Sequence, residues 1–319
     1  MKNKKIDWSN YKFRASQVHK LMTGSLPDKN EFNSRILQLK NERDLLVNAN
    51  GNKVKWTENK SDELAKLLVK KNTPYFDLLP QTMKSELRKI HRAETFNRNF
   101  SFTNKYVQKG LEQEEEAISV YQRYRKEVQG INGFFVNNKK RLSNEYTSGE
   151  ADLTDTNDFE NCNEGFDTKC SWELETFPFS GDKLDSSYEC QNQVYMWLSG
   201  AKKWRTTYVL VNVTEDLLHK EKMKWFYALN QPQDSDDKNY DVFVEKAKEL
   251  EIRLIFNYAE FVKANAGHQM EITKTEWREN NYDIPLDRRV VEKESFYNQF
   301  FIDDLIDRIN VSREYLMSI

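Results

Sequence analysis

The spacing of apolar residues predicts a long amphipathic helix over residues 104–128. Its apolar stripe repeats at about 3.6 residues, the period of an α-helix. The stripe consists of Val107, Leu111, Ile118 and Tyr121. Glu114 falls on this stripe, whereas the three neighbouring glutamates do not. The pattern therefore predicts that one carboxylate is turned toward the buried face of the helix.

Two short strand-like runs follow, and both carry charge among residues that a sheet would bury. Asp152 lies in the run 151–153, and Asp167 and Lys169 alternate with uncharged residues in the run 166–170. Residues two apart on a strand point to the same face of the sheet. Asp167 and Lys169 are therefore expected to project together.

A second helix is predicted over 186–199, begun by a serine cap and ended by Gly200. Gln191 and Tyr195 lie one turn apart on one face of this helix. The near-continuous apolar run 205–213 is typical of an interior strand. The alternation of helices and strands indicates an α/β fold.

Near the start of the chain, residues 13–24 read as a short helix with Ser16 as its N-cap and Gly24 as its stop. Arg14 and Ser16 would then lie where a helix start favours an anion. An ordinary cap beside a surface arginine is the alternative interpretation.

The remaining pattern predicts peripheral elements. They are helices near 30–47, 60–72, 239–251, 257–264 and 295–317, a hairpin within 130–153 and a strand near 286–293. We expect a single domain over 1–319, with its core at about 100–215. Residues 28–95 form a helical peripheral insertion in this scheme, and residues 216–319 cover the core.

Composition narrows the class of protein. The chain has 319 residues, 31% charged and 38% hydrophobic, with 19 Phe and 15 Tyr to build a core. A net charge of -2 does not exclude nucleic acid, because acids elsewhere can balance a basic cleft. Three cysteines without CxxC spacing indicate a reducing, cytoplasmic location and no iron–sulfur cluster. No signal peptide or membrane span is expected.

The charged positions indicate a metal-dependent hydrolase. Acids and a lysine that converge near a sheet are costly to desolvate unless a cation neutralises them. Carboxylate oxygens favour Mg²⁺, with Mn²⁺ as a substitute, and such a site suits hydrolysis of a phosphodiester. The expected ligands are Glu114, Asp152, Asp167 and the carbonyl of Thr168. Lys169 would orient water or stabilise the transition state, Gln191 would hold the lysine or a phosphate, and Tyr195 would buttress it.

Other interpretations stay open for each of these residues, since a surface ion pair or a satisfied core polar group also fits. The four histidines show no metal spacing. The chain has no GxSxG, Walker or GxGxxG motif, which argues against serine hydrolases, P-loop NTPases and dinucleotide enzymes.

In this order the signals resemble the YqaJ-like viral recombinases, the lambda-type exonuclease branch of the PD-(D/E)xK nucleases. The matching segments, spread over 12–214, are FRASQVHKLMTG, GLEQEEEAI, FFVNNKKRLSNEYTSGEAD, FDTKCSWELETFPF and ECQNQVYMWLSGAKK. Residues 286–315 are similar to the family's closing strand and helix. Residues 28–95 match poorly, and Ala151 stands where proline is common in the family.

The resemblance implies a PD-(D/E)xK core, a central mixed β-sheet flanked by helices, with the helical insertion added to it. Glu114, after Gly110, matches the helical metal ligand, and Asp152 matches the aspartate of the first strand. Asp167 and Lys169 match the acid and lysine of the signature. Gln191 or Gln193 matches the glutamine of the family's next motif, and Tyr195 matches its tyrosine. Arg14 and Ser16 resemble the early segment that contacts the 5′ phosphate in the family.

The activity that the resemblance implies is a Mg²⁺-dependent exonuclease that digests linear double-stranded DNA, often 5′ to 3′. Such an enzyme would act in phage-type recombination beside a single-strand annealing protein, in the bacterial host cytoplasm. A homo-oligomer stays open. The alternatives are an endonuclease on the same core, structure-specific or restriction-like, and a DNA-binding protein without catalysis.

Overall fold

The computed structural model describes residues 6–48, 50–98, 104–133, 135–137, 140–232, 237–265 and 270–319. Contacts divide the chain into two compact units. Unit 1 comprises 1–100, 144–147 and 299–319, and unit 2 comprises 101–143 and 148–298. The single domain expected over 1–319 stays a prediction. Among the described residues, none of the helices combines the length and apolar character needed to cross a bilayer.

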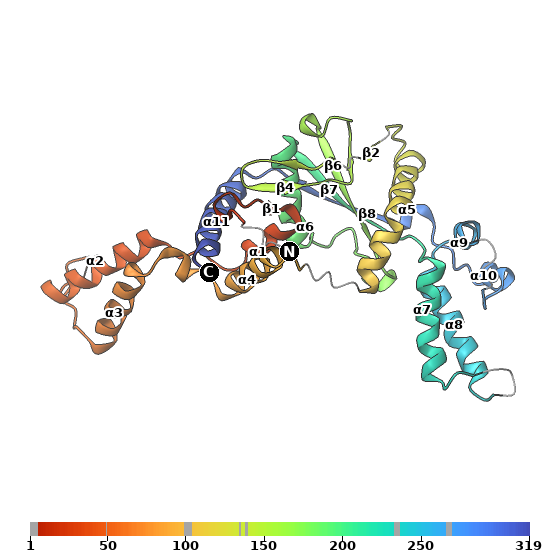
Figure 1. The fold of residues 1–319 in the computed structure, drawn as a ribbon, viewed down its shortest axis with the longest axis horizontal. Helices are drawn as coiled ribbons and strands as arrows, with labels where there is room; N and C mark the ends of the chain where they lie inside the picture. Colours follow the sequence, from red (N-terminus) through yellow and green to blue (C-terminus); the bar gives the residue numbers. More distant parts are fainter. Residues whose placement is uncertain are drawn as a thin grey trace. The chain divides into compact units, whose positions relative to one another are not determined.

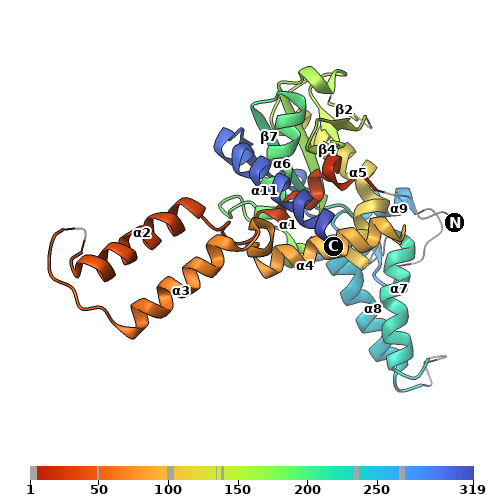
Figure 2. The ribbon, with the colours of Figure 1, turned by 60° about the vertical axis from the view of Figure 1, so that its left-hand side comes forward.

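Unit 1 is mostly helical. Its elements are β1 (Phe13–Arg14), α1 (Val18–Leu21), α2 (Lys29–Leu45), α3 (Glu58–Asn72), α4 (Gln81–Thr95) and α11 (Gln299–Ser318). The helices predicted near 30–47 and 60–72 are confirmed as α2 and α3, which form an antiparallel hairpin (Figures 1 and 2). The guanidinium of Arg35 pairs with Glu63 across the hairpin at 2.7 Å. Because the buried apolar cluster between these helices is small, such pairs help to hold the hairpin.

Helix α11 is hydrogen-bonded to the end of α1 and to the segment that follows it in unit 1. The Arg308 guanidinium donates to the carbonyls of Leu21, at 2.9 Å, and Gly24, at 3.0 Å. Gly24 has a φ of +70°, a conformation that favours glycine, but α1 ends at Leu21, three residues before the predicted stop. Because Arg308 is buried, its two carbonyl partners satisfy donors that would otherwise be costly to desolvate.

Unit 2 is built around a five-stranded mixed sheet in the order β2-β5-β6-β7-β8. The strands are β2 (Val136–Asn137), β5 (Leu153–Thr154), β6 (Glu164–Cys170), β7 (Lys203–Val209) and β8 (Val290–Phe296). Strands β6 and β7 are parallel, and the other neighbours are antiparallel. In the 130–153 region, β3 (Leu142–Ser143) and β4 (Thr147–Gly149) form the expected hairpin, whereas β2 pairs with β5 instead.

Two helices pack on opposite faces of this sheet (Figure 1). Helix α5 (Lys105–Glu127) covers the face that carries Phe166 and Val209, and its Tyr121 joins the same buried cluster. Helix α6 (Ser186–Ser199) covers the other face, where the Asn192 amide donates to Thr206 Oγ1 at 3.0 Å. Strand residues alternate between faces, so Asp167 and Lys169 point toward α6.

The rest of unit 2 consists of α7 (Glu215–Ala228), α8 (Tyr240–Leu254), α9 (Tyr258–Ala264) and α10 (Lys274–Glu279). Helices α7 and α8 lie side by side in Figures 1 and 2. The buried Glu251 carboxylate pairs with Lys222 at 2.6 Å and accepts the N–H of Ile272 at 2.8 Å. This carboxylate therefore joins both helices to the segment before α10. The sequence pattern did not predict α7 or α10.

The apolar stripe predicted for α5 is wrong in its first half. Val107 is 47% exposed and Leu111 is 71% exposed. The buried face instead begins with Lys109, which is 0% exposed and whose amine donates to the carbonyls of Ser171, at 2.7 Å, and Trp172, at 3.1 Å. Because a lysine occupies the buried position, a search for apolar periodicity selected the wrong side of these turns.

Several predicted ends also differ from the structure. The cap of α6 is Asp185, whose carboxylate accepts the N–H of Ser187 at 2.8 Å, whereas Gly200 ends this helix as predicted, with a φ of +77°. Strand β7 ends at Val209, although the buried apolar run continues to residue 213. Strand β8 begins at Val290, because 286–288 form a 3-10 turn.

Candidate active site

The pairing of β5 and β6 brings two aspartates together. Leu153 faces Phe166 across the antiparallel pair, so the preceding residue, Asp152, falls beside Asp167. The carboxylate of Asp152 accepts the backbone N–H of Thr168 at 2.7 Å. Both carboxyl groups are therefore placed by the backbone of the central strand rather than by flexible loops.

Lys169 completes this cluster of charges, because it lies two residues after Asp167 on the same face of β6. Its ammonium forms an ion pair with Asp167 Oδ2, and Asp167 is only 2% exposed. Burial alone would lower the pKa of Lys169, but the negative charges of Asp167 and Asp152 outweigh it and raise that pKa. The lysine is therefore held in its charged form.

The surroundings of Asp152 favour the protonated form of its carboxyl group. Burial and then repulsion by Asp167 raise the pKa of Asp152 to about 7, although Lys169 and the N–H of Thr168 act in the opposite direction. Two buried acids thus share one ammonium. Buried carboxylates with too little positive charge nearby are the chemical setting into which a divalent cation fits.

The buried oxygens of the cluster agree with this fit. Asp167 Oδ2 is buried on the face of β6 that carries Lys169, whereas the buried Thr168 Oγ1 lies on the opposite face of the strand. The Lys169 ammonium neutralises Asp167 Oδ2. Buried carboxylate oxygens of this kind are hard ligands that suit Mg²⁺.

Glu114 stands apart from the two aspartates. It is half-buried on α5, and its negative charge contributes to the raised pKa of Asp152, after larger contributions from burial and Asp167. Among the described residues, no three His, Cys, Asp or Glu side chains form a group that could hold a metal ion. Asp167 is turned to Lys169 and Asp152 to the N–H of Thr168, so their oxygens do not face one common point with Glu114. The metal site at residues 114, 152, 167 and 168 stays a prediction.

Helix α6 presents a polar stripe to the cluster. Tyr188, Gln191 and Tyr195 follow one another at helical spacing on one side of the helix. The Gln191 amide donates to the Tyr195 hydroxyl at 2.7 Å. Burial raises the pKa of Tyr195 well above its usual value, and the negative charge of Asp167 adds to this effect.

Tyr195 is fixed by a close approach of the backbone. A Cβ atom added to Gly149 on β4 would lie 2.8 Å from Cε1 of Tyr195. Only glycine therefore leaves room for the ring at this point. The segment 149–153 supplies both this contact and Asp152.

Gln193, the alternative to Gln191, does not join the cluster. Its amide donates to the carbonyl of Phe296 at 2.8 Å and accepts the N–H of Asn298 at 2.9 Å. It is 2% exposed and its hydrogen bonds hold the end of β8, and its contact with DNA stays a prediction. Sequence reasoning also missed the neighbouring Asn192, whose amide joins Thr206 to Ser295 Oγ at 3.0 Å each.

The predicted cap at Ser16 is wrong. Ser16 lies inside a 3-10 turn, Ala15–Gln17, and α1 that follows has four residues. The Arg14 N–H is bonded to the Gln17 side chain at 3.2 Å, and its guanidinium lies 3.8 Å from Glu94. Because so short a helix offers little dipole, the argument for an anion at this helix start fails. Both residues belong to unit 1, and their contact with a 5′ phosphate stays a prediction.

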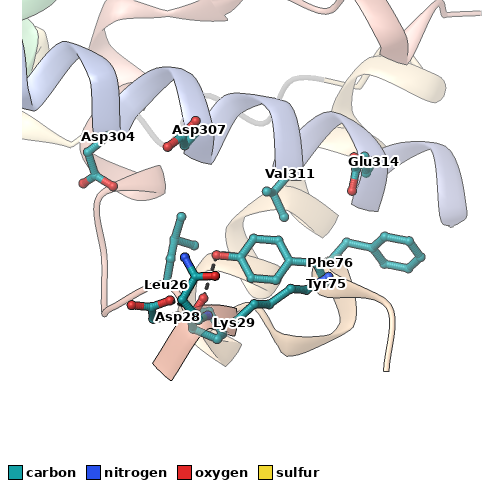
Figure 3. Close-up of a pocket in the computed structure, with 11 residues that line it drawn as sticks. Leu26, Asp28, Lys29, Tyr75, Phe76, Asp304, Asp307, Val311 and Glu314 are labelled. Carbon is teal, nitrogen blue, oxygen red and sulfur yellow. Dashed lines mark hydrogen bonds between the residues drawn. The ribbon is translucent and has the colours of Figure 1, made fainter. Parts of the chain in front are cut away.

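Unit 1 holds a second acidic place, a pocket of about 650 Å³ beside α11. Figure 3 shows Asp304, Asp307 and Glu314 along α11, with Tyr75 and Lys29 across the pocket from them. The Asp304 carboxylate already pairs with Arg308 at 2.9 Å, and Asp307 and Glu314 are exposed. This pocket lacks the buried convergence of acids and lysine seen at β6.

Comparison with solved structures finds exonucleases among the chains with a similar fold. A phage-related exonuclease from Haemophilus somnus 129PT matches with a TM-score of 0.53 and 20% identity, over 97% of this chain and 95% of that chain. The alkaline exonuclease LHK-Exo from Laribacter hongkongensis gives 0.39 and 10%, over 75% and 81%. LHK-Exo in complex with dAMP gives 0.38 and 9%, over 76% and 84%. No known family profile matches the chain, and no curated protein does. The predicted fold class is confirmed: the chain has the mixed α/β, PD-(D/E)xK fold of the phage-related exonuclease.

Proposed function

We propose that the protein is a Mg²⁺-dependent exonuclease that hydrolyses linear double-stranded DNA from its 5′ end. The observation that carries this proposal is the cluster of Asp152, Asp167 and Lys169 on the central strand pair. The fold shared with a phage-related exonuclease supports the proposal, because it is a scaffold on which an exonuclease is known.

In this proposal Asp152, Asp167 and the carbonyl of Thr168 hold the ion, and Glu114 completes the set. Mg²⁺, when bound, lowers the pKa of water and offsets the charge of the phosphate in the transition state. Asp167 on β6 and Asp152, which directly precedes β5, lie on one side of the sheet, and their carboxylates would turn from the Lys169 ammonium and the Thr168 N–H to bind the ion. Glu114 would have to turn toward them from α5.

The chain's own groups supply the remaining chemistry. The Lys169 ammonium, charged because of its two acidic neighbours, offers donors that orient a water or a phosphate oxygen. The Gln191 amide has a second N–H beside the one given to Tyr195, and it can reach the lysine or the phosphate. Burial of Asp167 keeps bulk water from screening these charges.

The wider setting is proposed on the resemblance alone. It comprises 5′ to 3′ polarity, a role in phage-type recombination in the bacterial cytoplasm, and a single-strand annealing protein as partner. Contacts of Arg14 and Ser16 with the 5′ phosphate belong to the same set.

The test compares linear and closed circular DNA of the same sequence, each incubated with the purified chain in Mg²⁺ or in chelator. Digestion of the linear duplex alone, only with Mg²⁺, is expected, and a labelled end with and without 5′ phosphate gives the polarity. Cleavage of the circle would indicate the endonuclease alternative. Binding without cleavage of either substrate would contradict catalysis altogether.

A further inference from the structure

We propose that Tyr188, held by Tyr208, is a positioning residue that fixes the ammonium of Lys169. The proposal deepens the nuclease function above and rests on it. Neither tyrosine belongs to the set of acids, lysine and amide that sequence reasoning assigned to the chemistry. The structure places both rings beside the lysine.

The contact is direct. Lys169 Nζ lies 4.9 Å from the centroid of the Tyr188 ring, within the range in which an aromatic face attracts a cation. Tyr188 lies at the beginning of α6, one turn before Gln191, and its ring contacts the Lys169 ammonium on β6. The ammonium therefore has two partners on different elements: Asp167 on its own strand and Tyr188 on the covering helix.

The sheet fixes the second tyrosine. In the parallel pairing of β6 and β7, Tyr208 lies opposite Lys169, on the same face of the sheet. Its ring meets that of Tyr188 edge to face, with centroids 6.1 Å apart and planes at 68°. Because Tyr208 belongs to an interior strand, it limits where the Tyr188 ring can turn.

A ring suits this task better than a further acid. A lysine side chain has a flexible four-carbon stem. Asp167 alone would therefore draw the ammonium of Lys169 down onto its carboxylate. An aromatic face attracts the cation without neutralising it, and it does not compete for the N–H donors that a phosphate needs. Tyr188 thus holds the ammonium on the side of α6 that carries Gln191.

The kinetic test compares Tyr188→Phe, which keeps the ring, with Tyr188→Leu, which removes it. We expect Y188L to lower kcat about tenfold with little change in KM for DNA, and Y188F to stay within about threefold of the wild type. In a Lys169→Ala background, Y188L should cost nothing further, because the partner is gone. Tyr227→Leu, on exposed α7 surface, is the matched control and should have no effect.

Equal loss of kcat in Y188F and Y188L would show that the hydroxyl acts instead of the ring and would overturn the proposal. If Y188L lowered kcat by the same factor in the Lys169→Ala background as in the wild type, the proposal would be overturned as well. Should Y188L fail to fold, Tyr208→Leu serves in its place, with an expected loss of about threefold from the released ring.

A readout independent of activity separates this proposal from the proposed function. The Tyr188 ring should shift the Lys169 ε-methylene NMR signal upfield in wild-type protein and in Y188F, and the shift should disappear in Y188L. A signal that does not move in Y188L would overturn the proposal. If the wild type cleaves no DNA, the nuclease function fails, while this measurement still decides whether Tyr188 holds the lysine.

Discussion

Two acidic places, one in each unit, differ in how their charges are arranged. In unit 2, the half-buried Asp152 and the buried Asp167 share one side of a sheet, in the field of one ammonium. In unit 1, Asp307 and Glu314 lie along α11 at the edge of the pocket in Figure 3, exposed to solvent. The number of acids is similar, but only the first place holds them in each other's field.

This difference has a physical reason. Repulsion between carboxylates falls steeply where water screens it, so exposed acids on a helix cost little and perform no particular chemistry. Buried acids with a shared lysine are costly to fold, and the raised pKa of Asp152 expresses that cost. The arrangement at β6 is thus the one that a function has to explain.

The largest effect is expected from Asp167→Ala and from Lys169→Ala. Each removes a charge from the interior of the cluster and should lower the rate of DNA cleavage by roughly a thousandfold, while DNA binding survives. Cleavage rates under single-turnover conditions, with circular dichroism as a check of folding, measure this. Full activity in either variant would contradict the assignment.

The second effect concerns the pH dependence of stability, in which Lys109 and Lys169 differ. Within the described part of the chain Lys109 forms no ion pair, and burial lowers its pKa to about 7 despite the charge of Glu173, opposite to the shift of Lys169. The unfolded chain therefore binds more protons than the folded one between pH 7 and about 10.5, so this group makes stability rise with pH by up to about 1.4 kcal/mol per pH unit.

Lys109→Met should remove that rise, so urea unfolding of the two proteins across pH 7 to 9 measures it. The absolute stability of K109M is not the readout, because the variant also leaves two carbonyls without a donor. Parallel curves for the wild type and K109M would show that Lys109 does not titrate in this range.

A third effect concerns glycines in different surroundings. Gly149→Ala should destabilise the protein by about 1 to 3 kcal/mol, because the new methyl group meets the Tyr195 ring at 2.8 Å. Gly110→Ala, in α5 with nothing within 4 Å, should instead stabilise it by roughly 0.5 to 1 kcal/mol. Thermal unfolding measures both, and the opposite order would argue against the packing of α6 on β4.

The smallest effect is expected from Asp307→Asn combined with Glu314→Gln in the unit 1 pocket. Exposed charges contribute little, so stability should change by less than about 1 kcal/mol and DNA cleavage by less than twofold. Unfolding and cleavage assays provide the comparison with the unit 2 variants. A loss as large as that of Asp167→Ala would mean that the acids of α11 take part in catalysis.

Some features of the fold and of the site could be predicted from the sequence, and others could not. Alternation along a strand was enough to place Asp167 with Lys169, because a sheet has a fixed period of two. The resemblance to lambda-type exonucleases led to the fold class, which the structure confirms. The apolar stripe of α5 failed, since a buried lysine bonded to two carbonyls looks like a surface residue in a sequence.

Other residues could not be found without the pairing of strands. Asn192 joins α6 to Thr206 and Ser295, and Tyr188 faces Lys169, through contacts between segments far apart in the chain. Nothing in the local pattern distinguishes Gln191 from Gln193. Their position around the helix relative to β8 separates them, and that depends on tertiary packing.

The fastening of α11 by Arg308 has a consequence for biosynthesis. The last twenty or so residues supply a helix to a unit whose other helices come from the first hundred. A ribosome therefore releases all of unit 2 before unit 1 can close. During translation the helices of residues 18–95 lack their contacts with α11 until residues 299–318 have been made, and a chaperone that shields them would raise the yield of native chain.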